Sequence, residues 1–402
     1  MKKPCWSWIS RLCARASTVV LAVAAMPAQA QIFTVLHSFT GSDGATPYAG
    51  LVRDAEGNLY GTTSGGGAYS HGTAFKLNKQ RKLTVLHSFN SDDGAFPTGQ
   101  LIRDSRGNLY GTAFQGGIAD YGVVFKLNPA GKQTTLYRFT GGADGGNPYA
   151  GLLRDAKGNL YGTTPRGGDG NPSGVVFKVD PAGKETVLHT FEWPYDGAYP
   201  MGNLVMDAKG NLYGTTEIGG GQGNCPESYC GTVFQLDRTD TETLLYRFPG
   251  PPNGANPIAG VIRDEKGNLF GATEGGGDSG CDFGGGCGVV FELDTAGKET
   301  VLYIFAGSTD GGYPEGGLVR DAAGNLYGTT YAFGNTGCQG GGCGVVFKVD
   351  KAGKETVLHT FTGGKDGGQP HAGLIFDGKG NLYGTTSVGG THNAGTVFKI
   401  TP

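Results

Sequence analysis

The chain has 402 residues, of which 77 are glycine and 38% are hydrophobic, and it carries a formal net charge of −3. No cluster of arginines and lysines stands out along the sequence, which disfavours nucleic acid binding because that function needs a basic footprint. No apolar run reaches the roughly 20 residues that a membrane-spanning helix requires.

The first 30 residues are predicted to be a signal peptide and not part of the fold. Basic residues precede a short apolar stretch at 17–26, and Ala28-Gln29-Ala30 forms a typical cleavage site. We expect cleavage after Ala30 and a secreted or periplasmic protein of residues 31–402. This part of the chain has 28 basic and 35 acidic side chains, which gives a net charge of −7.

The chain after Ala30 begins with a strand-like run, TVLHSF at 34–39, and continues with seven copies of one repeat. Copy three, residues 151–191, shows the pattern clearly. Four runs rich in Val, Leu, Thr, Tyr and Phe (GLLRD, NLYGTT, GVVFKVD and ETVLHTF) are separated by Gly, Asn, Asp or Pro. None of them keeps a helical period over ten or more residues. Each copy is therefore predicted to form four short antiparallel strands.

The copies are marked by an NLYG core, which is NLFG in copy five. Its asparagine recurs at spacings of 50, 51, 52, 57, 57 and 56 residues: Asn58, Asn108, Asn159, Asn211, Asn268, Asn325 and Asn381. A fixed period of this size, with four strands per copy, is typical of propeller blades. We predict an all-β fold, a seven-bladed β-propeller with four antiparallel strands per blade, as one domain of residues 31–402.

The two ends of the repeat array predict how the ring closes. The run at 34–39 belongs to the fourth-strand class, whereas the chain finishes with a third-strand run at 395–400. The N-terminal strand is thus expected to complete the last blade and to remove an exposed sheet edge.

Two acidic motifs recur in the turns. D-x-x-G-N joins the first and second strands of every copy, where Asp caps the turn and Gly supplies a positive φ; its aspartates are Asp54, Asp104, Asp155, Asp207, Asp264, Asp321 and Asp377. D-G-x-x-P precedes six of the copies, at Asp43, Asp93, Asp144, Asp196, Asp310 and Asp366, and Asn253 replaces Asp before copy five. A proline-locked turn explains the second motif, and a calcium site is the alternative. We otherwise expect no cofactor and no metal.

Six cysteines follow Ala30, in three close pairs within the loops between second and third strands of copies four to six. In an exported protein this arrangement predicts the disulfides Cys225–Cys230, Cys281–Cys287 and Cys338–Cys343. A zinc site would need ligands from different blades.

The histidines show no catalytic arrangement. His37, His87, His189 and His359 share one fourth-strand position with Tyr137, Tyr246 and Tyr303, which indicates packing against a neighbouring blade. No G-x-S-x-G or H-E-x-x-H motif is present. We therefore predict no catalytic residues.

At GNLYGTT (158–164), GVVFKVD (174–180) and GKETVLHTF (183–191) the sequence resembles the GloVer (Gloeobacter/Verrucomicrobia) tandem repeat family of exported bacterial proteins. The second strand also resembles that of NHL-type propeller blades. The resemblance covers residues 34–400 and implies export but no activity, and it transfers no catalytic residues. Many relatives carry a C-terminal anchoring signal; this chain has none, so a soluble form is expected.

The function predicted from the sequence is recognition: an exported propeller, expected to be a monomer, that binds a glycan or another envelope or extracellular ligand through one loop face. The alternatives are a structural or surface-assembly propeller without a small ligand, and a propeller lyase or hydrolase acting on an extracellular polymer. Aromatic side chains near the long loops of copies four to six are the predicted ligand contacts: Trp193, Tyr195, Tyr229, Phe283, Tyr331 and Phe333.

Overall fold

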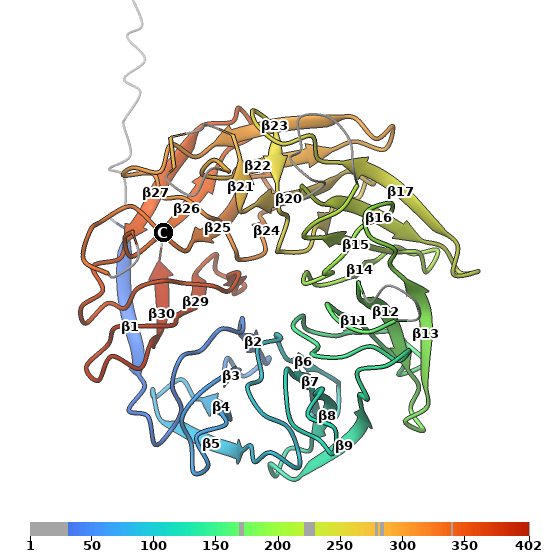
Figure 1. Ribbon diagram of the computed structural model, residues 1–402. Helices are drawn as coiled ribbons and strands as arrows, with labels where there is room; N and C mark the ends of the chain where they lie inside the picture. Colours follow the sequence, from blue (N-terminus) through green and yellow to red (C-terminus); the bar gives the residue numbers. More distant parts are fainter. Residues whose placement is uncertain are drawn as a thin grey trace, which may run out of the picture. The chain divides into compact units, whose positions relative to one another are not determined.

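The computed structural model describes residues 31–168, 173–220, 230–277, 280–281, 285–338 and 341–401. These residues contain 30 strands and no helix. Seven four-stranded antiparallel sheets surround a central axis as the blades of a β-propeller (Figure 1). The fold class predicted from the repeat is confirmed.

Each blade takes its strands in chain order from the axis outward, except that the last blade takes its outermost strand from the N-terminus. Blade 1 consists of β2 (Val52–Arg53), β3 (Leu59–Thr63), β4 (Thr73–Leu77) and β5 (Leu83–Ser88), and blade 2 of β6 (Ile102–Arg103), β7 (Leu109–Ala113), β8 (Val123–Leu127) and β9 (Gln133–Arg138). Blade 3 consists of β10 (Leu153–Arg154), β11 (Leu160–Thr164), β12 (Val175–Val179) and β13 (Glu185–Thr190), and blade 4 of β14 (Val205–Met206), β15 (Leu212–Thr216), β16 (Thr232–Leu236) and β17 (Glu242–Arg247). Blade 5 consists of β19 (Ile262–Arg263), β20 (Leu269–Thr273), β22 (Val289–Leu293) and β23 (Glu299–Ile304). Blade 6 consists of β24 (Val319–Arg320), β25 (Leu326–Thr330), β26 (Val345–Val349) and β27 (Glu355–Thr360). Blade 7 consists of β28 (Ile375–Phe376), β29 (Leu382–Thr386), β30 (Thr396–Thr401) and β1 (Ile32–Ser38). A small extra sheet in the loops of blade 5 pairs β18 (Gly254–Ala255) with β21 (Gly275–Gly276).

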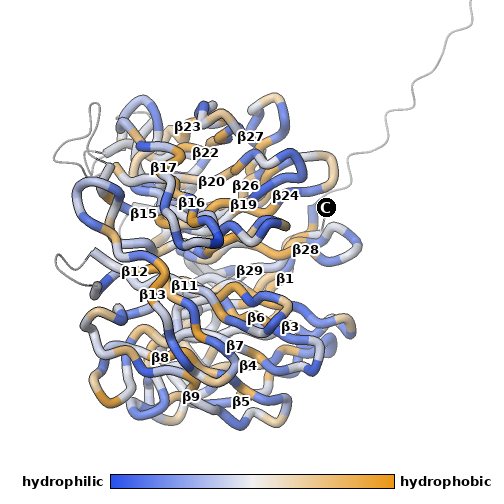
Figure 2. Tube along the Cα trace, turned by 90° about the vertical axis from the view of Figure 1, so that its right-hand side faces the viewer, coloured by the Kyte–Doolittle hydropathy of each residue, from blue (hydrophilic) through white to orange (hydrophobic). Residues whose placement is uncertain are grey.

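The middle strands of each blade are buried because neighbouring blades cover both of their faces. All five residues of β3 are buried, and four of the five in β4, whereas β5 is only partly buried. Figure 2 shows that apolar residues run along the strands and that several of the turns are hydrophilic. Every fourth strand also carries a β-bulge, which increases the twist of the blade.

Phenylalanines hold the blades together. At each of the seven seams, the Phe that follows a fourth strand meets the third-strand Phe of the next blade edge to face, with ring centroids 4.9–5.3 Å apart. The glycine of the NLYG core makes room for the second ring. In blade 1, a Cβ on Gly61 would lie 2.8 Å from Cζ of Phe75, so a larger residue there would displace the ring.

The D-x-x-G-N motif forms the tight turn that the sequence predicts. In blade 1 the Asp54 carboxylate accepts hydrogen bonds from the Asn58 backbone and side chain, at 2.7 and 2.8 Å, and from the Tyr60 hydroxyl at 2.9 Å. The turn glycine has a φ between 81° and 98° in all seven copies, a range that glycine adopts without strain.

Ring closure follows the prediction. β1 pairs antiparallel with β30, so that Thr34 lies opposite Lys399 and Ser38 lies opposite Thr396. A second link lies nearer the axis, where the Thr385 hydroxyl of blade 7 donates to the Ala49 carbonyl before blade 1, at 3.1 Å. The two ends of the chain are therefore joined by backbone and side-chain contacts.

The exchange of His and Tyr in the fourth strand also has a structural explanation. Both side chains donate a hydrogen bond to the Asp of the D-G-x-x-P loop that leads into the next blade, over 2.9–3.2 Å at six seams. At the seam before blade 5, where Asn253 replaces Asp, the Tyr246 hydroxyl donates instead to Glu299 at 2.6 Å. These residues fix the seam, in agreement with the predicted packing role.

Removal of β1 should destabilise the ring. A protein that lacks residues 31–38 loses the partner strand of β30 and the apolar contacts of Phe33 and Leu36, each of which contributes roughly 2 kcal/mol. We expect Tm, measured by calorimetry, to fall by about 5 °C relative to a protein that begins at Gln31, because the melting entropy of a chain of this length is roughly 0.8 kcal/mol/K. Equal Tm values for the two proteins would show that closure by β1 contributes nothing to stability.

Candidate functional site

The longer loops of the blades gather on one side of the ring, here called the loop face. It consists of the D-G-x-x-P connecting loops and of the loops between second and third strands. The two kinds of loop pair with each other in each blade, as Ala45 does with Gly65. They also bond across seams, where the Thr46 backbone N–H donates to the Ala394 carbonyl at 2.9 Å.

One residue of each connecting loop has a left-handed backbone although it is not glycine. It directly precedes the loop proline, and its φ lies between 53° and 57° in Thr46, Phe96, Asn147, Tyr199, Asn256, Tyr313 and Gln369. Such a conformation costs on the order of 1 kcal/mol and persists only where neighbouring contacts enforce it. In every copy the backbone N–H of this residue donates a hydrogen bond to a backbone carbonyl of the preceding blade. The residue after the proline is thereby held at the axis.

These residues after the proline surround the opening of the central channel, here called the channel mouth: Tyr48, Thr98, Tyr149, Met201, Ile258, Glu315 and His371. They line a cavity of about 300 Å³ together with the glycine-rich segments that precede the first strands. The seven positions are equivalent in the repeat, yet no two neighbours carry the same residue. The channel mouth is thus chemically asymmetric within a nearly symmetric ring.

A hydrogen-bonded pair of a carboxyl group and an imidazole lies at the centre of this asymmetry. Oε2 of Glu315 lies 2.5 Å from Nδ1 of His371. The imidazole is flanked by two rings, with centroid distances of 4.2 Å to Tyr48 and 4.7 Å to Tyr331. The two members of the pair are 17% and 13% exposed, respectively, so water reaches both, but only in part.

Two further glutamates lie behind the mouth, at the position that follows the second strand. Burial raises the pKa of Glu217. Burial, with the nearby Glu315 and Glu217, raises the pKa of Glu274 to about 7. Across the ring, burial and the same three carboxylates raise the pKa of the Tyr149 hydroxyl. Glu315 lines the cavity, whereas Glu217 and Glu274 influence Tyr149 electrostatically from behind it.

Within the described part of the chain no group of three His, Cys, Asp or Glu side chains could hold a metal ion. The channel mouth instead combines flat tyrosine rings with carboxyl and imidazole groups. Rings of this kind stack on sugar rings or other flat ligands, and a carboxyl group with a pKa near 7 can both donate and accept hydrogen bonds at neutral pH.

The residues predicted as ligand contacts lie in different places. Tyr331 packs beside His371 at the channel mouth. Phe333 is partly buried, with its ring centroid 5.4 Å from that of Tyr313. Trp193 and Tyr195 lie in the connecting loop before blade 4 and are 38% and 71% exposed. Tyr229 and Phe283 lie outside the described residues. Ligand binding by these side chains remains a prediction.

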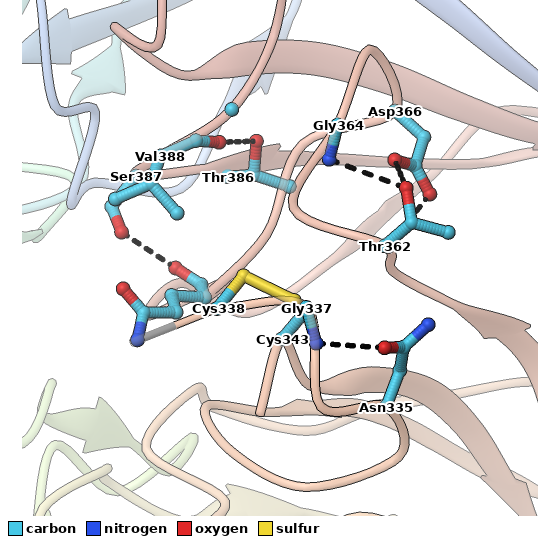
Figure 3. Close-up of a disulfide and its surroundings, with 12 residues drawn as sticks. Asn335, Gly337, Cys338, Cys343, Thr362, Gly364, Asp366, Thr386, Ser387 and Val388 are labelled. Atoms are coloured by element: carbon cyan, nitrogen blue, oxygen red, sulfur yellow. Dashed lines mark hydrogen bonds between the residues drawn. A yellow bond between two sulfur atoms is a disulfide. The ribbon is translucent and has the colours of Figure 1, made fainter. Parts of the chain in front are cut away.

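Cysteine pairs brace the same loops. Cys281 is bonded to Cys287 and Cys338 to Cys343, as the sequence predicts. Each disulfide lies over a left-handed glycine of the next connecting loop; a Cβ on Gly363 would lie 2.5 Å from the Cys338 sulfur. Figure 3 shows this disulfide beside the segment that carries Thr362 and Asp366. The loops of neighbouring blades are therefore packed together away from the axis.

Sequence reasoning missed Glu217, Glu274, Glu315 and His371. Aligning the seven copies would have found them. The two positions that form the mouth vary freely, whereas the residues around them are nearly constant. This variation marks side chains that the repeat does not need for packing.

The fold and the channel mouth define a seven-bladed β-propeller built from one tandem repeat, with one distinctive cluster at its axis. The chain belongs to the Gloeobacter/Verrucomicrobia repeat family, whose sequence model matches residues 22–226 and 225–402. The resemblance drawn from the strand motifs is thus confirmed. A comparison with curated proteins finds none that matches.

Similar solved structures include two extracellular domains from B. thetaiotaomicron, described as parts of the hybrid two component system BT3049 and the one component system BT4673. Their sequence identities to the chain are 14% and 13%, with TM-scores of 0.56 and 0.55 over 92% of it. The chain spans 41% of the length of each domain. At this identity the likeness concerns the fold alone.

No helix among the described residues has the length and apolar character needed to cross a membrane.

The raised carboxyl pKa values predict a pH-dependent stability. Burial raises the pKa to about 7 in Glu274 at the mouth and in Glu185 and Glu355 at the seams, from an ordinary value of 4.5. A carboxyl group with a raised pKa binds its proton more tightly in the folded state than in the unfolded state. Its contribution to the free energy of unfolding is therefore complete below pH 4.5 and is lost as the pH rises through 7. We expect Tm to fall between pH 5 and pH 8, and to fall less in Glu274→Gln. Glu56→Gln, which removes an exposed carboxylate, is the matched control; an equal pH dependence in both variants would contradict the assignment.

The third cysteine pair can be tested chemically. Cys230 is disulfide-bonded, and its predicted partner, Cys225, lies outside the described residues. Mass spectrometry of non-reduced peptides from the exported protein should recover a Cys225–Cys230 link. A link from Cys230 to any other cysteine would refute the prediction.

Proposed function

We propose that the protein is an exported recognition module that binds a glycan over the channel mouth of its loop face. The observation that carries this proposal is the gathering of Tyr48, Tyr149, Glu315 and His371 around one cavity at the axis. In a tandem repeat, side chains that differ between copies and converge on one cavity are free to serve a ligand.

Export is supported by the disulfides and by the predicted signal peptide. Structural disulfides persist in oxidising compartments and are rare in the cytosol. The extracellular domains from B. thetaiotaomicron show that a related propeller architecture is used outside the cell. The family's export, implied by the sequence resemblance, points the same way.

A sugar suits the chemistry of the mouth. Tyrosine rings bury a flat apolar surface at little cost in side-chain entropy. Sugar hydroxyls donate and accept hydrogen bonds, and Glu274, with a pKa of about 7, can do both in return. Glu315 is already hydrogen-bonded to His371. A ligand seated here would also be within reach of Tyr331, the one predicted contact that lies at the mouth.

An enzyme acting on an extracellular polymer is the second candidate, and the Glu315–His371 pair favours it. A carboxylate that accepts from Nδ1 fixes the imidazole tautomer and leaves Nε2 able to take a proton. The pair could then serve as a general base in hydrolysis or elimination. A purely structural role would require neither the Glu315–His371 pair nor the raised pKa of Glu274.

Glycan-array binding of residues 31–402 tests the proposal. Tyr149→Ala combined with His371→Ala should lower the affinity for a bound glycan at least tenfold, because the two substitutions remove two central contacts. Trp193→Ala combined with Tyr195→Ala, the matched control on the outer loop face, should leave it unchanged. Both variants should keep the wild-type Tm within a few degrees.

If Trp193→Ala with Tyr195→Ala lowers the affinity and Tyr149→Ala with His371→Ala does not, the site lies instead in the aromatic loops before and within blades 4 to 6. Failure to bind any glycan on the array would overturn the proposal. Shortening of a bound oligosaccharide during overnight incubation, seen by mass spectrometry and lost in His371→Ala, would favour the enzyme.

A further inference from the structure

The side of the ring opposite the loop face has a different composition. We call it the turn face. It consists of the tight turns between first and second strands and of the segments that run from the third-strand lysine through the turn to the fourth strand: residues 53–57, 76–82, 103–107, 126–132, 154–158, 178–184, 206–210, 235–241, 263–267, 292–298, 320–324, 348–354, 376–380 and 399. The two turn classes adjoin in blades 1 to 6; in blade 1, for example, a Cβ on Gly57 would lie 2.6 Å from Cε of Lys79.

Basic side chains are concentrated on this face. It holds 24 of the 28 arginines and lysines that follow Ala30. Counting also the glutamates that begin the fourth strands beside these turns (Glu185, Glu242, Glu299 and Glu355), it holds 19 acidic side chains, so the excess is five positive charges. The rest of the described chain holds four basic and 12 acidic side chains. The net charge of −7 therefore conceals two faces of opposite sign.

Several of these cations are ordered by aromatic rings. The first-strand arginine of one blade lies over the second-strand ring of the preceding blade, with its guanidinium carbon 5.1–5.8 Å from the ring centroid at four seams. A third-strand lysine lies over four of the second-strand tyrosines, at 5.7–5.9 Å. The stacked arginines have lost part of their side-chain freedom before any partner arrives.

Apart from these ring contacts, the lysines and arginines of the described segments form no ion pair. All five ion pairs found in the described segments use histidine as the cation, and none uses lysine or arginine. The acidic residues of the turn face are engaged elsewhere: Asp104, for example, accepts hydrogen bonds from Asn108 and Tyr110. The excess charge is thus available to a partner outside the chain.

We infer that the turn face docks onto an anionic lipid bilayer. Its cations are distributed around the ring over six or more blades, which matches a planar charged surface better than a single polymer strand held in a groove. The exposed rings of Trp193, Tyr195 and Tyr199 lie on the loop face, so docking by the turn face rests on charge. Each lysine or arginine near an anionic membrane contributes about 1 kcal/mol at low salt, and the attraction falls off within a Debye length.

The opposite charge of the two faces also sets the orientation. A membrane that attracts the turn face repels the acidic loop face, so the channel mouth points away from the lipid. The inference stands independently of what binds at the mouth, because it uses no residue of that site.

Co-sedimentation with sucrose-loaded vesicles tests the docking. Residues 31–402 should bind vesicles of 40% phosphatidylglycerol in phosphatidylcholine at 50 mM NaCl, not bind pure phosphatidylcholine, and be released at 500 mM NaCl. The turn-face variant carries Lys79→Glu, Lys132→Glu, Lys184→Glu and Lys354→Glu and should bind more than tenfold more weakly, as expected from about 1 kcal/mol per cation.

The matched control has the same change in net charge on the other side of the ring: Arg138→Glu, Arg166→Glu, Arg247→Glu and Lys365→Glu. It should bind as tightly as the wild type. All eight positions are exposed, and the pair Lys79→Glu and Lys82→Glu serves as a milder variant if the quadruple change lowers Tm. No binding to anionic vesicles, or equal losses in the two quadruple variants, would overturn the inference. Binding to immobilised polygalacturonate but not to vesicles would also overturn it and reassign the face to an acidic polysaccharide.

Discussion

The edge-to-face contact of two phenylalanines at every seam is the interaction on which the ring depends. A four-stranded blade has apolar residues on both faces and cannot bury them alone, so each blade is stable only between two neighbours. Because the contact runs from a fourth strand to the next third strand, the last seam needs a fourth strand ahead of blade 1. β1 supplies it, and Phe39 then meets Phe75 as the corresponding pair does elsewhere. Closure is therefore required by the same packing that repeats around the ring.

The closed ring fixes the backbone at the axis and leaves the side chains there unconstrained. The left-handed residue before each loop proline is bonded to the preceding blade, so the following residue reaches the channel mouth whatever its identity. Tyr48, Met201 and Glu315 occupy the same position with quite different chemistry. The backbone at the axis is fixed whatever these side chains are, and for that reason the proposed binding site is placed where Glu315 and His371 meet between flanking rings.

The sequence was sufficient for those features that every copy repeats or that lie close in the chain. The four strands, the Asp54-type turn, the pairing of β1 with β30 and two disulfides all follow from local motifs and from the order of strand classes. The candidate site did not follow, because Glu315 and His371 are 56 residues apart and meet only when blades 6 and 7 pack side by side. The predicted aromatic contacts were chosen because they lie in the long loops, but membership of a loop does not decide where each side chain packs. Tyr331 lies at the mouth, whereas Phe333, two residues later, packs beside Tyr313.

The two faces use the repeat in opposite ways. On the turn face the same arginine and lysine positions recur, so that sevenfold geometry multiplies a weak contact into a broad charged surface, which suits a partner that is itself extended and repetitive. At the channel mouth the copies differ, so that sevenfold geometry brings seven side chains of six kinds to one point, which suits a small and specific ligand. One repeat can support both because the strands between the faces hold the packing. Each face is then free to change without disturbing the Phe–Phe seams that keep the ring closed.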